Sequence, residues 1–512
     1  MREMELTYEA VPGVPLPSLD GLPRVAAVSG PEIETLAAEY YDTEDLRLFR
    51  AGGTLRRWAG GAAGGAGAQW QLELPGEAAR HEAARREVRV PAGGPGGPVP
   101  DELACLVRAY TRGAALRPVA RVQTRRRRMT LRDATGASLA EVLADEVTAQ
   151  TFGASTVLTR WNEVGVEPTG GGPRLLRAAD RHLRDGGLRR AGRSVALARA
   201  LGAEPPRPRR ARRLAGRPAA GEVVLAYLDA QAARLASLDA AVRRDLPDSV
   251  HQMRVTTRRL RSALQSFPAI LPEPATRHLR GELRWLGAVL GEARDGEVLS
   301  EYLLTQLAGV PAELAMGPVR ARIRAYFAPR EGSARNAVLQ ALDSGRYVAM
   351  LDELDRLLGD PPLTAAAAAP ADEILPRAVA RAYRRTRRRM RRAKRAAAGP
   401  DRDVALHQTR KAAKRARYAA EAARPALGRR AARLADRMKA VQSVLGRHQD
   451  AVNARALARE IGVQAHLAGE NAFSFGLLYE RADQDARRRQ DEASRAWKRA
   501  ARHGGRAWPA AG

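Results

Sequence analysis

The C-terminal half of the chain contains one block of residues twice, and this repeat limits the possible folds more than any other feature. The block reads Val-His-Gln-Met-Arg at 250–254 and Leu-His-Gln-Thr-Arg at 406–410, and further cations follow each copy at matching positions. A second block, Leu-Gly followed by an aspartate, comes later in both copies, at 290–295 and at 445–450. Two matched blocks in the same order predict two related helical units with an approximate two-fold relation.

In both copies the histidine and the cations fall on one side of a helix. Their spacing of i, i+3, i+7 and i+10 gives, at 100° per residue, a stripe about 80° wide. These basic stripes consist of His251, Arg254, Arg258 and Arg261 in the first copy, and of His407, Arg410, Lys414 and Arg417 in the second. The opposite side of the first helix is apolar, with Met253, Leu260, Ala263, Leu264 and Phe267. Stacked guanidinium groups suit a chain of phosphates, because each can bind two oxygens at once.

The charge of the whole chain favours polyanionic partners but does not choose among them. The formal net charge is +30, and only five of the 87 basic residues are lysine. Nucleic acid, an anionic membrane surface and polyphosphate all fit such an excess. An ordinary exposed helix face in an arginine-rich chain is the alternative for either stripe. The run 377–395 has eleven basic residues and no acid, and both a solvated helix and a wall of an anion groove remain open for it.

Composition divides the chain near residue 205. Before it, strand-like segments at 3–9, 54–58, 69–74, 86–91, 119–132, 138–144 and 161–167 alternate with Gly- and Pro-rich breaks. Residues 204–221 form a Pro- and Arg-rich linker, and almost everything after 222 has helical composition. We therefore expect an α+β multidomain protein with a β-rich domain at 1–203, the linker, an all-α domain at 222–505 and a tail at 506–512.

Cysteine content and hydropathy indicate the compartment. Cys105 is the only cysteine, which excludes an intramolecular disulfide and a cysteine-based zinc site. The N-terminus has no apolar core of a signal peptide, and no apolar run approaches the ~20 residues that cross a bilayer. We expect a cytoplasmic protein that is not inserted into a membrane.

The duplicated motif, His-x-x-Arg-x-x-x-Arg-Arg-x-Arg followed by Leu-Gly and Asp, resembles the CHAD family over roughly 222–505. The resemblance implies two pseudo-symmetric four-helix units around a basic groove that binds inorganic polyphosphate, without any required cofactor. The implied binding residues are His251, Arg254, Arg258, Arg259, Arg261, His407, Arg410, Lys414, Arg415 and Arg417.

A second series of motifs runs through the N-terminal region. In order they are Glu-Met-Glu-Leu-Thr-Tyr at 3–8, Leu-Arg-Arg-Trp at 55–58, Trp-Gln-Leu-Glu-Leu at 70–74, four arginines at 125–128 and Trp-Asn-Glu-Val-Gly-Val-Glu at 161–167. In that order they resemble the CYTH family, the triphosphate tunnel metalloenzymes, over about 1–203. The resemblance implies an eight-stranded antiparallel β-barrel that binds a triphosphate and a divalent metal inside.

Alternation along a strand gives the candidate residues of that tunnel. Carboxylates two or four residues apart share a face and could hold Mg²⁺ or Mn²⁺: Glu3, Glu5, Glu163 and Glu167, with Glu141 and Asp145 as weaker candidates. The candidate phosphate ligands are Arg56, Arg57, Arg86, Arg125 and Arg127. Glu5 and Arg56 are the candidate catalytic residues. The solvent face of a sheet is the alternative interpretation of these alternating charges.

Four departures from the CYTH pattern concern the chemistry directly. Thr7 and Glu73 stand where the family has lysines, Trp58 where a second inward arginine is expected, and Gly165 within the closing run of glutamates. Two lysines, one inward arginine and one metal carboxylate are therefore lost, and one acid is added. The sequence predicts a degenerate tunnel with weak or absent triphosphatase activity.

Three functions follow, in order of preference. The first is a polyphosphate-binding protein with a weak or inactive triphosphatase-like barrel. The second is an active, metal-dependent inorganic triphosphatase whose helical half captures the substrate. The third is nucleic-acid binding, which the charge alone allows, although aromatic residues make up only 4% and no stacking platform is evident. The preferred phosphate chain length, the oligomeric state and an association with polyphosphate-containing granules stay open.

Overall fold

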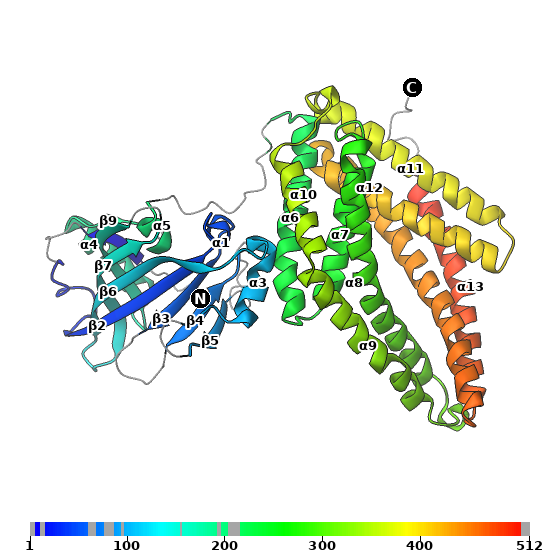
Figure 1. Ribbon diagram of the computed structural model, residues 1–512, viewed down its shortest axis with the longest axis horizontal. Helices are drawn as coiled ribbons and strands as arrows, with labels where there is room; N and C mark the ends of the chain where they lie inside the picture. Colours follow the sequence, from blue (N-terminus) through cyan, green and yellow to red (C-terminus); the bar gives the residue numbers. More distant parts are fainter. Residues whose placement is uncertain are drawn as a thin grey trace. The chain divides into compact units, whose positions relative to one another are not determined.

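The computed structural model describes residues 6–10, 16–59, 68–75, 87–93, 97–153, 156–191, 196–202, 214 and 216–502. Its contacts divide the chain into two compact units, 1–210 and 211–512. The division falls within the predicted linker, 204–221. Unit 1 is built on a β-sheet and unit 2 is helical (Figure 1).

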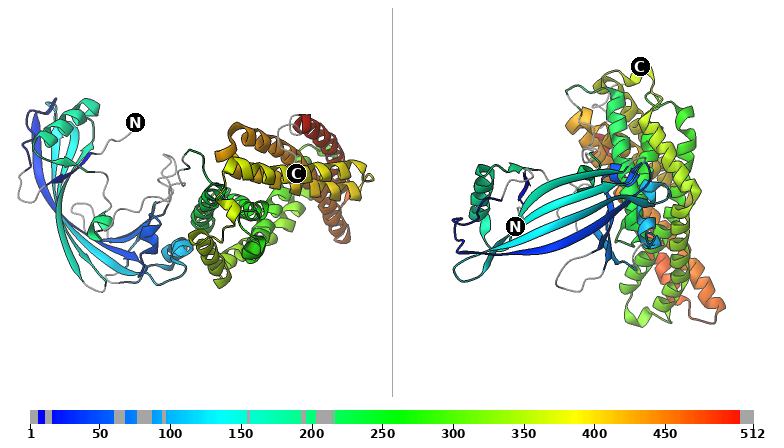
Figure 2. Two further views of the ribbon diagram at one scale, coloured as in Figure 1. Left: turned by 90° about the horizontal axis from the view of Figure 1, so that it is seen from above. Right: turned by 60° about the vertical axis from the view of Figure 1, so that its left-hand side comes forward.

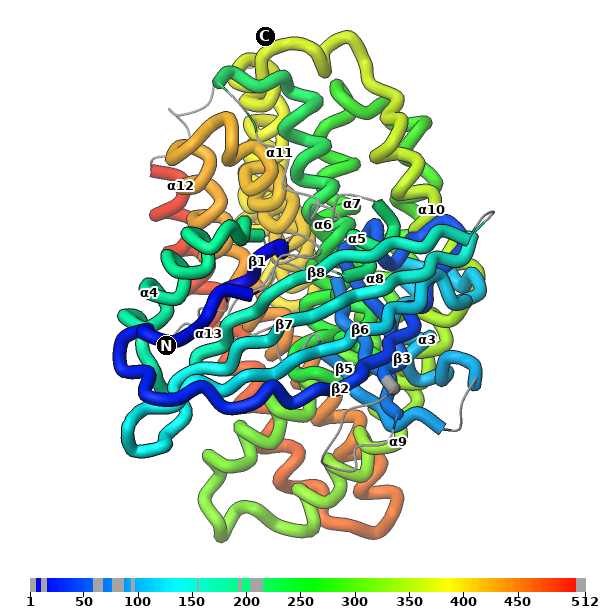
Figure 3. Tube along the Cα trace, turned by 90° about the vertical axis from the view of Figure 1, so that its left-hand side faces the viewer, coloured from blue at the N-terminus to red at the C-terminus, as the bar shows by residue number. Residues whose placement is uncertain are grey.

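Unit 1 contains a nine-stranded antiparallel sheet in the order β5-β4-β3-β2-β6-β7-β8-β1-β9. Its strands are β1 (Leu6–Ala10), β2 (Ala27–Asp42), β3 (Thr54–Ala59), β4 (Gln69–Glu73), β5 (Glu87–Pro91), β6 (Arg117–Arg132), β7 (Ser138–Thr151), β8 (Val157–Pro168) and β9 (Arg189–Arg190). The long central strands β2, β6, β7 and β8 lie side by side in Figure 3, and the sheet is strongly curved (Figure 2). Among the described residues of unit 1, the helices are α1 (Arg47–Arg50), α3 (Asp101–Thr111), α4 (Gly172–Asp185) and α5 (Ala196–Ala200).

The sequence predicts an eight-stranded closed barrel, and the structure shows a sheet with two ends. Within the described ranges, no ladder joins β5 to β9 or to β1, so ring closure is not seen. Antiparallel pairing throughout agrees with the prediction. Closure of this sheet into a tunnel stays a prediction.

The two faces of the sheet in unit 1 differ in chemistry. On the α4 face, Val142, Ala144, Val164 and Val166 pack against apolar side chains of α4, such as Leu175. Residues one position along the strands point the other way, because successive side chains alternate. Cross-strand register puts Arg126, Asp145 and Glu163 together on this second face, which we call the Arg126 face.

Unit 2 consists of eight α-helices among the described residues, with two short 3₁₀ turns. The helices are α6 (Ala220–Arg243), α7 (Ser249–Ser266), α8 (Glu273–Ala308), α9 (Val319–Asp343), α10 (Gly345–Gly359), α11 (Ala371–Arg395), α12 (Pro400–Leu467) and α13 (Phe473–Arg502). From α6 to α10 and from α11 to α13, neighbours in sequence pack on each other, and α12 also packs on α6, α7 and α8. Figure 1 shows α6, α7 and α8 running beside one another.

The order of helices in unit 2 repeats. Gly428 has φ 52° and ψ −135°, so the helical geometry of α12 is interrupted there and the element has two segments, 400–427 and 429–467. A positive φ of this kind suits glycine, which has no Cβ. Helices α6, α7, α8 and α9 then correspond in order to α11, the two segments of α12, and α13. This agrees with the predicted duplication, while an approximate two-fold relation between the copies stays a prediction.

No helix in the part of the chain that the structure describes is long and apolar enough to cross a membrane.

Candidate anion-binding site

The two basic stripes lie on α7 and on the first segment of α12, which pack against each other. Their apolar sides anchor both helices. Met253 and Leu260 on α7 and Phe267, which follows its last residue, are at most 1% exposed, and Ala413 and Ala416 on α12 are fully buried. This confirms the apolar side predicted for the first stripe. With one side of each helix fixed in the core, the cations lie on the other side.

Four cations from the two helices meet in this space. Each of Arg258, Arg410 and Lys414 is half-buried. Burial is the main cause that lowers the pKa of Lys414, to about 6, and the positive charges of Arg410 and Arg258 lower it further. Burial also lowers the pKa of Arg258, with contributions from Arg254 and Arg410. The two stripes therefore converge, and we call Arg254, Arg258, Arg410 and Lys414 the cation cluster.

The repeated Leu-Gly and Asp motif supports the first arginine of each stripe. A Cβ on Gly291 would lie 3.5 Å from Nη2 of Arg254, so this guanidinium rests on the backbone of α8. Asp295, one turn later, accepts two hydrogen bonds from Arg254, at 2.7 and 3.3 Å. The glycine makes room for the guanidinium, and the aspartate orients it.

The second copy repeats this arrangement with one difference. A Cβ on Gly446 would lie 3.6 Å from Nε of Arg410. Asp450 affects Arg410 through its charge but forms no ion pair with it within the described residues. Burial raises the pKa of Asp450, Arg410 lowers it, and the charge of Asp295 raises it again. The two aspartates of the repeat thus lie near each other at the cation cluster.

Several polar atoms at the cluster are buried without a hydrogen-bond partner in the described structure. They are Nδ1 of His251, Nδ1 of His407, Nε of Arg258 and Nε of Arg410. Burial lowers the pKa of both histidines, and neighbouring cations lower it further. Unsatisfied buried donors cost free energy, commonly about 1–3 kcal/mol each. An anion in this space would offer them acceptors.

Two further predicted binding residues share one carboxylate partner. Arg259 forms an ion pair with Glu421 at 3.3 Å, and Arg417 forms one with the same carboxylate at 2.6 Å. Arg417 also donates to Gln442 at 3.3 Å. Both guanidinium groups lie near the ring of Tyr418. Glu421 therefore pairs with one arginine from each copy, and Arg259 and Arg417 are less available to a ligand.

A second group of cations continues from the cluster. Burial lowers the pKa of Arg415 to about 10, and the charges of Arg385, Arg261 and Arg280 contribute. Burial and the charge of Arg284 lower the pKa of Arg261 as well. Arg385 belongs to the basic run 377–395, so this run contributes at least one residue to the basic surface. Most other arginines of the run are exposed on α11, whose apolar side is buried.

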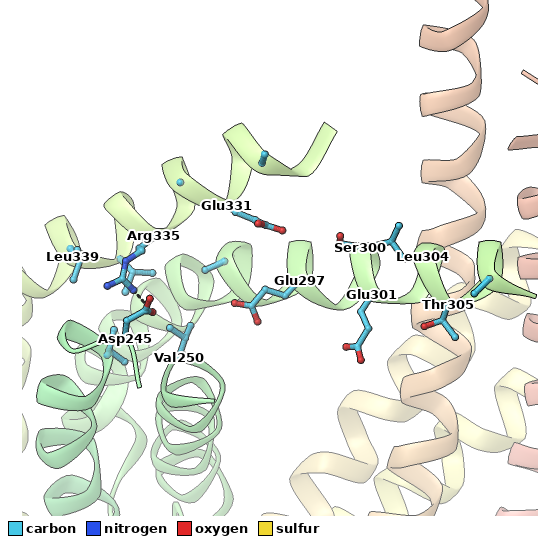
Figure 4. A pocket seen from close by; sticks show the side chains of 16 residues that line it. Asp245, Val250, Glu297, Ser300, Glu301, Leu304, Thr305, Glu331, Arg335 and Leu339 are labelled. Carbon is cyan, nitrogen blue, oxygen red and sulfur yellow. Dashed lines mark hydrogen bonds and ion pairs between the residues drawn. The ribbon is translucent and has the colours of Figure 1, made fainter. Parts of the chain in front are cut away.

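A cavity elsewhere in unit 2 has the opposite charge. It has a volume of about 940 Å³ and lies between α8, α9 and the junction of α6 and α7. Glu297, Glu301 and Glu331 line it, and Arg335 is paired with Asp245 at 2.6 Å (Figure 4). Such a lining repels anions, so this cavity does not compete with the cation cluster as a phosphate site.

The Arg126 face of unit 1 contains part of the predicted tunnel residues. Arg56 donates to Gln71 at 2.7 Å and lies opposite Tyr40 in the ladder. Glu163 is half-buried, and burial raises its pKa. Glu167 is on the same face, since its pair with Glu141 lies four residues along the ladder from the pair of Asp145 and Glu163. The face also brings together residues that form ion pairs with one another.

These internal ion pairs involve arginines that the sequence interpretation did not select. Arg126 donates to both oxygens of Asp145, at 2.8 and 2.7 Å. Arg128 donates to Glu34 at 3.2 Å. The predicted Arg125 and Arg127 are on the other face, each 3.8 Å from Glu146. Their position follows from strand alternation and could have been inferred from the facing partners of β6, had β2 been recognised.

The remaining predicted tunnel residues divide between the two faces and the undescribed segments. Arg57 is 9% exposed and pairs with Trp70, so it is on the face opposite Arg56. Thr7 lies directly opposite Gly165, and Glu73 shares the face of Arg56 through the register of β3 and β4. Three further predicted residues, Glu3, Glu5 and Arg86, lie outside the described residues.

The described carboxylates do not by themselves complete a metal site. Glu163 and Glu167 share a face, but Glu163 already accepts a hydrogen bond from Nε1 of Trp161 at 3.2 Å. No group of three or more His, Cys, Asp or Glu side chains suited to a metal ion occurs among the described residues. Mg²⁺ and Mn²⁺ stay predictions that depend on Glu3 and Glu5.

Comparison with known proteins identifies the helical unit. A family model described as the CHAD domain matches residues 226–459, within the 222–505 predicted for this domain. The chain belongs to the same family as the uncharacterized protein Rv2226 of Mycobacterium tuberculosis (strain ATCC 25618 / H37Rv), to which it is 35% identical over 495 residues, 93% of this chain and 92% of that protein.

Several solved structures are similar to parts of the chain. PptA from Streptomyces chartreusis is similar over 55% of this chain and 99% of its own, with 24% identity and a TM-score of 0.47. The CHAD domain from the plant Ricinus communis covers 57% of this chain and 94% of its own, with 28% identity and a TM-score of 0.46. HpAC1 from Hippeastrum, for which a dominant triphosphatase activity is described, covers 40% of this chain and 97% of its own, with 13% identity and a TM-score of 0.22.

Proposed function

We propose that this CHAD-domain protein binds inorganic polyphosphate at the cation cluster formed by α7 and α12. The observation that carries the proposal is the convergence of Arg254, Arg258, Arg410 and Lys414, from two copies of one motif, in a half-buried space. Like charges held so close repel one another, and a polyanion would remove that repulsion. The resemblance to the CHAD family, described above, implies the same ligand.

The local environment favours a chain of phosphates over a single carboxylate or phosphate. The second group of cations, which includes Arg261, Arg385 and Arg415, continues from the cluster across α7, α11 and α12. A linear polyanion can contact both groups at once, whereas a small anion can contact only one. Affinity should therefore increase with phosphate chain length until both groups are occupied.

A charge-reversal experiment tests the site. Replacing all four residues of the cation cluster by Glu should abolish binding of long-chain polyphosphate to the full-length protein. Calorimetric titration measures this binding. The matched control reverses four exposed arginines of unit 2: Arg320, Arg324, Arg459 and Arg499. Both variants have the same net charge, so a purely non-specific attraction would weaken equally in both. Unchanged affinity in a folded cluster variant would place the anion site elsewhere.

A competition experiment separates polyphosphate from nucleic acid. Directly linked phosphates present charge more densely than a nucleic-acid strand, and stacked arginines match the denser chain. Polyphosphate should displace labelled DNA at equal phosphate concentration, and DNA should displace polyphosphate poorly. The opposite order would make nucleic acid the preferred ligand. Binding should also weaken steeply with salt, because each phosphate contact releases counterions.

For unit 1 we propose a degenerate triphosphate tunnel with slow or absent turnover. Stabilising a transferring phosphoryl group requires fixed cations and metal. Here Arg126 and Arg128 are engaged by Asp145 and Glu34, and Thr7 faces Gly165 rather than a charged group. An active metal-dependent triphosphatase is the second candidate, favoured by Glu163 and Glu167 on one face.

Phosphate release from inorganic triphosphate by the full chain, with Mg²⁺ or Mn²⁺, distinguishes these two. Slow or undetectable release is expected. Robust turnover that is abolished by Glu5→Gln or Glu163→Gln, with polyphosphate binding retained, would establish the enzyme.

A further inference from the structure

Lys414 is the one lysine in the two basic stripes. The corresponding residue of the first copy is Arg258. Arginine keeps its charge at any pH a protein meets, whereas a lysine amine can lose its proton when burial and nearby cations disfavour the charged form. In a chain with only five lysines, this position therefore differs from its counterpart in the one property that pH can control.

The surroundings of Lys414 are dominated by positive charge. Arg254 and Arg258 face it from α7, and Arg410 precedes it by one turn on α12. No ion pair involving Lys414 occurs among the described residues. His407, two turns earlier, is influenced by the same amine, and burial lowers the pKa of this imidazole.

Two carboxylates are near enough to influence the amine without neutralising it. Asp295, on α8, is engaged by Arg254. Asp450, on the second segment of α12, is also affected by Lys414, but burial raises its pKa. Because burial and the charges of three arginines disfavour the charged amine, the pKa of Lys414 falls to about 6. At pH 7.5 the ligand-free site thus contains mostly the neutral amine.

We propose that the cation cluster takes up a proton when it binds polyphosphate, and that Lys414 is the group that holds it. The inference rests on the proposed polyphosphate function and adds its regulation. Releasing the proton relieves repulsion among the arginines while the site is empty. A bound polyanion raises the pKa of the amine again, because it stabilises each positive charge beside it. The ligand is therefore bound together with a proton.

The direction of the pH effect follows from this linkage. Between the pKa of the free site, about 6, and the higher pKa in the complex, the complex holds one more proton than the free protein. Affinity must then fall as pH rises, by up to about tenfold per pH unit, and level off below about pH 6. Burial and neighbouring cations also lower the pKa values of His251 and His407.

Calorimetry of the full-length protein with long-chain polyphosphate measures the proton directly. Titrations at pH 7.5 in buffers of different ionisation enthalpy should give an uptake of about one proton for the wild type. Lys414→Arg should reduce that uptake by about one and should bind at least tenfold more tightly than the wild type at pH 8.5. The matched control is Lys411→Arg, an exposed lysine on the same helix, which should behave as the wild type.

The outcomes separate the two levels of the argument. If the wild type does not bind polyphosphate, the proposed function fails. If it binds without proton uptake, or if Lys414→Arg takes up as many protons as the wild type, the proton inference fails and the binding site stands. A His407→Gln variant completes the set. If proton uptake on binding disappears in this variant and not in Lys414→Arg, the uptake belongs to the imidazole, and the proposed role of Lys414 is wrong.

Discussion

The effect of substituting the two motif glycines should depend on the size of the new side chain: alanine should raise stability, and leucine should weaken polyphosphate binding. An ideal Cβ on Gly291 meets Arg254 at 3.5 Å, and one on Gly446 meets Arg410 at 3.6 Å. Both distances are ordinary van der Waals contacts, so alanine fits without moving either guanidinium. Because glycine inside a helix is less favourable than alanine by about 0.5–1 kcal/mol, each Gly→Ala change should stabilise unit 2 by that amount.

Leucine at the same positions tests the proposed function of the space. Its branched end would occupy the volume of the guanidinium, so Gly291→Leu must displace Arg254 and break its hydrogen bonds to Asp295. Loss of one charge-assisted contact costs about 1.5–3 kcal/mol, roughly a 10- to 150-fold weaker polyphosphate affinity. The dependence of log K on log salt should decrease by about one unit.

Thermal unfolding and polyphosphate titration of the alanine and leucine variants, run side by side, provide the measurement. Alanine should raise the unfolding midpoint by about 1–4 °C and leave affinity within a factor of two. The reasoning is refuted if Gly291→Ala weakens binding as much as Gly291→Leu. In that case the glycine would serve the backbone of α8 and not the placement of Arg254.

Three further outcomes are expected. Lys414→Met should abolish tight polyphosphate binding while stabilising the ligand-free protein by about 1–3 kcal/mol, because it removes a half-buried amine from among arginines. In the wild type, the Lys414 amine of the unfolded chain keeps its proton to about pH 10.5, whereas that of the folded chain loses it near pH 6. The free energy of unfolding, measured by chemical denaturation, should therefore rise with pH between these values. The Met variant should lack this contribution of Lys414 to the pH dependence. Glu421→Gln should lower the unfolding midpoint, since its two arginine partners lose their counter-charge, and should tighten polyphosphate binding in a direct titration. Thr7→Lys with Glu73→Lys should raise the rate of phosphate release from triphosphate with Mg²⁺, and an unchanged rate would mean that lost cations do not limit the tunnel.

The sequence predicted most of the helical unit because the relevant signals are local. The spacing of the basic stripes and the apolar residues opposite them are properties of single helices, and Met253 and Phe267 are buried as expected. The Leu-Gly and Asp motif predicts a helix contact at the glycine and an aspartate that orients a basic side chain. It does not predict which arginine is involved, since the contact between Gly291 and Arg254 joins two helices that no local pattern connects. The shared partner of Arg259 and Arg417 was missed for the same reason.

The β-rich unit was predicted less completely. Strand β2 was not anticipated, because Gly30 and Pro31 interrupt it and Leu-Ala-Ala-Glu at 36–39 has helical composition. Its strand conformation comes from pairing with β3 and β6, which are distant in sequence. Without β2 and the register, the four arginines at 125–128 could not be assigned to faces. The structure puts Arg126, rather than its neighbours, beside Asp145.

Glu421 makes the two copies of the repeat dependent on each other. The corresponding residue of the first copy is Gln265, so the acid exists once, yet it pairs with Arg259 of the first copy and Arg417 of the second. A perfect duplicate could lose a residue in one half and rely on the other. Here, a chain assembled from two first halves would have glutamine at both positions and two half-buried arginines without a counter-charge. The halves have become complementary parts that can no longer be exchanged.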